Sequence, residues 1–116
     1  NDKVAYVNYC GLENDKYHAL AEKYLPNGSC GVVSFGVKGG RKAAEEFMKH
    51  LKLGSIETHV ADARTCCLHP ASATHRQMND EELTACGVYP DLVRYSCGLE
   101  DAEDLIADLE QAFAQI

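Results

Sequence analysis

The sequence has little positive charge, no long apolar run and none of the closely spaced cysteine pairs that bind structural zinc. Each of these absences excludes a class of protein. Only 11 lysines and arginines stand against 18 aspartates and glutamates, which gives a net charge of -7. Nucleic acids and anionic membrane surfaces both select basic faces, so we expect neither as a partner. No apolar run approaches the ~20 residues of a membrane span, and no charged-then-apolar secretory leader is present.

The composition is otherwise that of an ordinary globular domain. The chain has 116 residues, of which 46% are hydrophobic and 25% charged, enough for one domain with one core over 1–116. Six cysteines are many for this length, but nothing in the sequence indicates secretion. We therefore expect reduced, mostly buried cysteines in a cytoplasmic protein. The chain begins at Asn1 in a strand-like segment, which suggests a domain cut from a longer protein.

Periodicity predicts alternating strands and helices. Strands are expected at 4–9, 31–37, 56–60, 65–69 and 92–97, and helices at 15–24, 41–52, 79–86 and 101–116. Asp15, Asn79 and Asp101 are the expected helix caps, and Asn79 with Glu82 forms a near capping box. The simplest arrangement is α/β: a mixed sheet with helices on one face, whose other face is partly polar. That polar face suggests a missing partner domain.

The segment 88–100 holds an arginine in mid-strand. Alternation puts Val93, Tyr95 and Cys97 on one face of the strand, and Leu92, Arg94 and Ser96 on the other. A guanidinium presents a rigid fork of donors that matches a carboxylate. From the pattern alone, an edge-strand arginine paired with a surface acid is the more ordinary interpretation.

Other constellations are weaker. Cys66, Cys67, His69 and His75 lie close in sequence but lack the knuckle spacing of structural zinc, and adjacent cysteines point to opposite faces of a strand. A thiol dyad with either histidine has no distinctive frame. Lys38-Gly39-Gly40 before a helix could bind an anion, but two glycines there are more often a tight turn. His59, at the end of a short strand, is ordinarily a hydrogen-bonded structural group.

Several stretches together resemble one family. They are Val7-Asn-Tyr-Cys-Gly-Leu12, Tyr24-Leu-Pro-Asn-Gly28, Ser34-Phe-Gly-Val-Lys-Gly-Gly40, His69-Pro-Ala-Ser-Ala-Thr-His75, Leu92-Val-Arg-Tyr-Ser-Cys-Gly-Leu-Glu100 and Asp104-Leu-Ile-Ala-Asp-Leu-Glu110. In this order they resemble the C-terminal domain of the Cys/Met-metabolism family of pyridoxal-phosphate enzymes. Within it, the sulfhydrylases that act on O-acetylhomoserine are most similar.

The resemblance implies the small C-terminal domain of a fold-type I transferase. Such proteins attach pyridoxal phosphate to a lysine in a Ser-x-Thr-Lys frame of a preceding large domain, and no lysine here has that frame. The fragment alone is therefore expected to hold no catalytic residue. Its expected partners are its own N-terminal cofactor domain, further copies in a homotetramer, and a small amino-acid substrate. Arg94 matches the arginine that binds the substrate α-carboxylate in this family.

The segment Glu57-Thr-His-Val-Ala-Asp-Ala-Arg-Thr65 matches the family segment that lines the substrate pocket, so Thr58 and His59 are expected to bind substrate. His59 stands where many members have asparagine, and Ala61 where many have glycine. Cys10 replaces the usual proline. Because histidine titrates near neutral pH, the presence of His59 in place of asparagine leaves the polarity of the pocket undetermined.

Three functions are compatible with these observations. The resemblance favours γ-replacement, in which an activated homoserine loses acetate and sulfide or a thiol adds, giving homocysteine or methionine. A cystathionine γ-synthase or a γ-lyase would share the same motifs. A free-standing α/β ligand-binding module is the alternative from another class, and it would bind an amino acid unaided.

Overall fold

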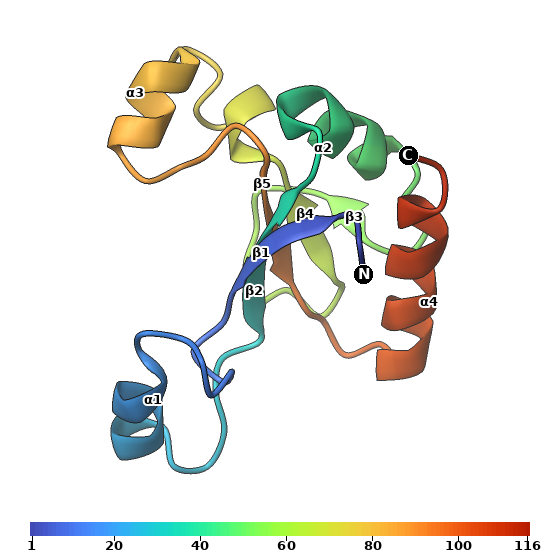
Figure 1. Ribbon diagram of the computed structural model, residues 1–116. Helices are drawn as coiled ribbons and strands as arrows, with labels where there is room; N and C mark the ends of the chain where they lie inside the picture. The colour runs from blue at the N-terminus through green and yellow to red at the C-terminus, as the bar shows by residue number, and fades with distance from the viewer.

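A five-stranded sheet forms the centre of the computed structural model, which describes all 116 residues (Figure 1). Its order is β1 (Val4–Asn8), β2 (Val32–Val37), β5 (Leu92–Ser96), β4 (Cys66–Leu68) and β3 (Ser55–Ile56). The pairs β1–β2, β2–β5 and β5–β4 are antiparallel, and only β3–β4 is parallel. The expected mixed, mainly antiparallel sheet is confirmed.

Two long helices cover one face of this sheet. They are α2 (Gly40–Lys49) and α4 (Ala102–Phe113), whose packing places Phe47 against Phe113 with ring centroids 4.4 Å apart. Phe35, Val93 and Tyr95 contribute the strand side of the same buried cluster. Burying a large apolar side chain contributes about 1.5–3 kcal/mol, so this layer dominates the stability of the domain.

Three shorter elements lie outside the helical layer. They are α1 (His18–Tyr24), the 3₁₀ turn η1 (Pro70–Ser72) and α3 (Asp80–Ala85), and Figure 1 shows α1 and α3 away from the α2–α4 layer. The capping box expected for α3 is confirmed: Asn79 accepts from the Glu82 N–H, and the Glu82 carboxylate accepts from the Asn79 N–H. Asp101 likewise caps α4 by accepting from the Glu103 N–H. Local sequence thus sets where both helices begin.

The face opposite the helices carries the predicted thin, polar stripe. Ser34, Arg94 and Leu68 are direct neighbours across β2, β5 and β4, and Gly36 pairs with Leu92. A Cβ added to Gly36 would meet the Tyr6 ring at 2.2 Å, so the ring of Tyr6 occupies the space that the glycine leaves. The close approach expected at Gly36 is therefore confirmed, and the approaching group is a side chain of this same chain.

The structure corrects two predicted elements. The strand expected at 56–60 is only Ser55–Ile56, and 57–65 is a loop that turns through Ala61, which adopts a left-handed φ of 58°. The helix expected from Asp15 starts at His18 and has no side-chain cap; Asp15 instead accepts from the Tyr17 N–H in the preceding turn. Alternating residue types did not reveal that the chain leaves the sheet after Ile56.

The cysteines are less buried than expected. Cys66 and Cys67 are buried and, as adjacent strand residues, lie on opposite faces, but Cys30, Cys86 and Cys97 are exposed. Cys97 follows the last residue of β5 and, as predicted, lines the helix-covered side of the sheet with Tyr95 and Val33, but it is exposed there and not part of the buried core. None of the six forms a disulfide. No helix in the structure has the length and apolar character needed to cross a bilayer.

Candidate functional site

Arg94 lies in the middle of β5 on the side of the sheet opposite the helices. Its Nη2 donates to the carbonyl oxygens of Thr58 at 2.7 Å and His59 at 3.2 Å. Its Nε is buried and has no hydrogen-bond partner, and no carboxylate of the chain lies within ion-pairing range of the guanidinium. The arginine is thus not the acid-paired edge residue that the pattern alone favoured. Its guanidinium is always charged, and its Nε has no acceptor within the chain.

The loop 57–65 carries its own charge network. The Arg64 Nη2 lies 3.1 Å from Glu57 Oε1 and 3.3 Å from Asp62 Oδ2. The second oxygen of Glu57, Oε2, lies 2.8 Å from Nδ1 of His59, whose ring is largely exposed. Glu57 therefore bridges two basic side chains of the loop, while the backbone carbonyls of Thr58 and His59 contact Arg94.

The end of the loop is fixed by groups from the segment after β5. The Glu100 carboxylate accepts from the Thr65 N–H at 2.8 Å and from the Thr65 hydroxyl at 2.7 Å. The Thr65 hydroxyl oxygen in turn accepts from the Gly98 N–H at 2.9 Å. The hydrogen bonds from Thr65 hold the pKa of Glu100 below its usual value. The loop and the strand that carries Arg94 are thereby joined at both the guanidinium and the Gly98–Glu100 turn.

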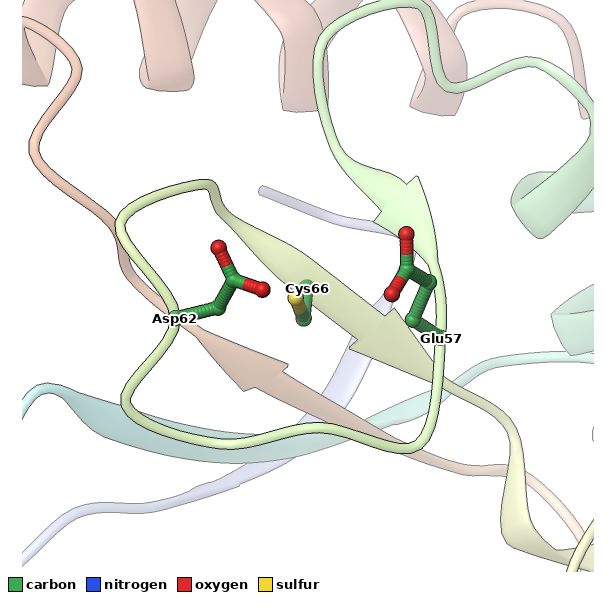
Figure 2. A group of neighbouring side chains, drawn as sticks. All are labelled: Glu57, Asp62 and Cys66. Atoms are coloured by element: carbon green, nitrogen blue, oxygen red, sulfur yellow. The ribbon is translucent and has the colours of Figure 1, made fainter.

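One group of side chains has the spacing of metal ligands. Figure 2 shows Glu57 and Asp62 flanking Cys66 on β4, and ligand atoms of the three lie within 4.8 Å of one another. The guanidinium of Arg64 already binds both carboxylates. Burial raises the pKa of the Cys66 thiol, which disfavours the thiolate that a metal needs. We read the group as an ion-pair cluster.

The histidines weighed from sequence serve the architecture. The His69 Nε2 donates to the Pro90 carbonyl at 2.7 Å, and its Nδ1 lies 2.8 Å from the Ser72 hydroxyl. His75 Nδ1 lies 2.9 Å from the Thr74 hydroxyl. Neither imidazole hydrogen-bonds a cysteine, and the Cys67 thiol, whose pKa burial raises to about 12, contacts the Met48 sulfur. The structure therefore brings together no thiol–imidazole pair.

Sequence reasoning missed the charged residues that shape the site. Glu57, Asp62 and Arg64 lie in the segment matched to the substrate pocket, yet only Thr58 and His59 were singled out there. Asp108 was also missed, although it interrupts the apolar stripe of α4. Its buried carboxylate accepts from the N–H groups of Lys52, Leu53 and Gly54. An acid on an otherwise apolar helix face was the signal that could have identified it.

These observations define a small two-layer α/β domain that presents an unpaired arginine on its open face. The model of the family described as Cys/Met metabolism PLP-dependent enzyme matches residues 1–114, and the chain belongs to this family. The resemblance inferred from the motifs is thereby confirmed.

The curated relatives are sulfhydrylases and synthases. The chain is 47% identical over 112 residues to O-acetyl-L-homoserine sulfhydrylase 1 of Thermus thermophilus, covering 97% of this chain and 27% of that protein. It is 46% identical over 110 residues to the homocysteine synthase of Schizosaccharomyces pombe, covering 95% and 26%. The chain thus spans about a quarter of the length of the curated relatives it matches.

A solved structure shares the fold. It is described as an O-acetylhomoserine (thiol)-lyase of Campylobacter jejuni carrying a pyridoxyl-lysine monophosphate; it matches with a TM-score of 0.89 and 36% identity, covering 98% of this chain and 27% of that one.

The family depends on pyridoxal phosphate, but this chain offers the cofactor no attachment. Of its lysines only Lys3 is partly buried, and its Nζ donates to the Ile116 carbonyl; the others are exposed. A covalently held cofactor needs a lysine inside an enclosed site, and none is placed so.

Proposed function

We propose that this chain is the C-terminal, substrate-carboxylate-binding domain of a pyridoxal-phosphate-dependent O-acetylhomoserine sulfhydrylase. The longer protein would replace the γ-acetoxy group of the substrate by sulfide or a thiol, giving homocysteine or methionine. The observation that carries the proposal is Arg94: a mid-strand guanidinium on the open sheet face with a buried, unsatisfied Nε and no acid beside it. The names of the relatives support the reaction class.

In this proposal the chain binds and orients the substrate. Arg94 receives the α-carboxylate through its free donors, because a planar fork holds a planar anion in one orientation. The carbonyls of Thr58 and His59 hold Nη2 and so set the direction of the fork. His59, exposed beside the arginine, contributes the polar rim of the pocket. The cofactor supplies electron withdrawal from the bound amino acid when it is present in the remainder of the protein.

The partners follow from what the chain lacks. Because no lysine here is placed to hold the cofactor, we propose that the chain works against its own N-terminal cofactor domain and is inactive alone. A homotetrameric assembly and a cytoplasmic location complete the proposal. Six unpaired cysteines, three of them exposed, suit a reducing compartment.

The test uses the longer protein that carries this chain. O-acetylhomoserine is supplied with sulfide, cysteine or water as the acceptor, and product is measured for each. Fast turnover with sulfide supports the proposal, whereas preference for cysteine indicates a cystathionine γ-synthase and preference for water a γ-lyase. Arg94→Ala is expected to raise KM steeply, and Arg94→Lys to restore it only in part. A near-normal KM in Arg94→Ala would remove the binding role.

A further inference from the structure

The loop 57–65 carries a cluster of ion pairs formed by Glu57, Asp62 and Arg64. Glu57 and Asp62 approach each other closely enough that their carboxylates and the Cys66 sulfur lie within 4.8 Å. Like charges so close repel, and Arg64 compensates both through contacts of 3.1 and 3.3 Å. The hydrogen bonds of Arg64 hold the pKa of Asp62 below its usual value, which favours the charged form of that carboxylate.

These acids belong to the loop whose backbone carbonyls bind the open arginine. Glu57 immediately precedes Thr58, whose carbonyl receives Arg94 Nη2 at 2.7 Å, and the Asp62–Arg64 turn returns the chain toward β4 next to β5. Without Arg64, Asp62 would lose its basic partner and Glu57 would keep only the His59 imidazole, in the loop next to a site that is to receive a third carboxylate. The cluster would then oppose the binding of the anion that Arg94 attracts.

We infer that Arg64 is a specificity-determining residue of the carboxylate subsite: by neutralising Glu57 and Asp62, it keeps the surroundings of Arg94 favourable to an anion. The inference rests on the proposed function, since it assumes that a carboxylate binds at Arg94. Arg64 acts through charge compensation and has no contact with the substrate. Its effect therefore depends on the sign of its charge and on the presence of the acids.

The experiment compares variants of the longer protein with two substrates, O-acetylhomoserine and its α-carboxamide. Arg64→Gln should raise the KM for the carboxylate substrate roughly three- to tenfold, the size expected of one or two unit charges left unbalanced near a surface anion site. The kcat and the KM for the carboxamide should change little. Arg64→Lys, which keeps the charge, should remain near the parent. Added salt should reduce the difference between Arg64→Gln and the parent.

Two further variants separate charge from structure. Glu57→Gln combined with Arg64→Gln should return the KM for the carboxylate substrate toward the parent value, because one uncompensated acid is removed. Arg76→Gln is the matched control, since Arg76 is exposed and forms no ion pair but changes the net charge equally. An equal rise in KM for both substrates, an equal effect of Arg64→Lys, or no rescue by Glu57→Gln would overturn the inference.

The same series distinguishes this inference from the proposed function. If Arg94→Ala leaves the KM for the carboxylate substrate unchanged, the proposed binding role fails whatever Arg64 does. If Arg94→Ala raises that KM and Arg64→Gln does not, only the inference about Arg64 fails.

Discussion

Arg94 and Thr58 are joined by a hydrogen bond of 2.7 Å between Nη2 and the carbonyl oxygen, which links the middle of β5 to a loop 36 residues earlier in the chain. A backbone carbonyl neutralises no charge, so the bond orients the guanidinium and leaves its charge available. The geometry of the loop therefore sets the direction of the arginine.

Ala61 is the one non-glycine residue with positive φ, at 58°, and it lies inside this loop. An L-residue with a Cβ is strained in the left-handed region by about 1–2 kcal/mol. We expect Ala61→Gly to raise the free energy of unfolding by up to about 1 kcal/mol, because the gain is partly offset by the entropy of glycine. Chemical denaturation measures it. Ala63→Gly, which has no positive φ to relieve, is the control and should be neutral or destabilising.

Gly98 allows the loop backbone to pass close to β5. A Cβ at this position would lie 2.5 Å from the Ala63 carbonyl oxygen and the Arg64 carbonyl carbon, so Gly98→Ala must displace the loop. We expect a destabilisation of about 1–3 kcal/mol, as for other overpacked sites, together with a higher substrate KM in the longer protein. Gly31→Ala is the control, since its Cβ would meet only the Cys97 carbonyl at an ordinary 3.6 Å. Equal effects of the two substitutions would contradict the close approach.

Asp108 ties α4 to the turn after α2. Burial tends to raise the pKa of its carboxyl, but the N–H donors of Gly54, Lys52 and Leu53 outweigh burial and lower that pKa below its ordinary value. We expect Asp108→Asn to cost roughly 1–3 kcal/mol of stability near neutral pH, because charge-assisted hydrogen bonds to a partly buried group are lost.

The sign of the pH dependence follows from the lowered pKa. The stabilisation is present above the unfolded-state pKa near 3.8 and is lost as the pH falls through the folded-state pKa. The difference in unfolding free energy between the parent and Asp108→Asn should therefore narrow on acidification below pH 4. A difference that stays constant down to pH 2 would show that packing alone accounts for the effect.

The sequence predicted the elements that rest on local chemistry. Asn79 and Asp101 were placed correctly because capping residues act within three positions of themselves, and the faces of β5 followed from strict alternation. The face of Arg94 was therefore predictable, whereas its carboxylate-binding role, expected from the family motifs, stays a prediction. The strand expected at 56–60 was wrong because the loop is set by long-range contacts, from Arg94 and from Glu100, that periodicity does not encode.

The helix at 18–24 shows the opposite difficulty. Tyr17, Leu20 and Tyr24 have the spacing of a buried stripe, yet all three are more than half exposed and only Ala21 is buried. The pattern identified a helix correctly, but it could not reveal that α1 would lie away from the core. Glu57 and Arg64 were missed for a related reason, since the order of charged residues in a loop does not indicate which of them will form ion pairs.

The discrimination between a substrate carboxylate and its carboxamide tests the central claim most directly. The measurement is the ratio of kcat/KM for O-acetylhomoserine to that for its α-carboxamide, in the longer protein and in its Arg94→Ala variant. The account predicts a large ratio in the parent that falls at least tenfold in Arg94→Ala, about the 1.4 kcal/mol or more that a charge-assisted bidentate contact contributes. A ratio that survives the substitution unchanged would show that the carboxylate is held elsewhere.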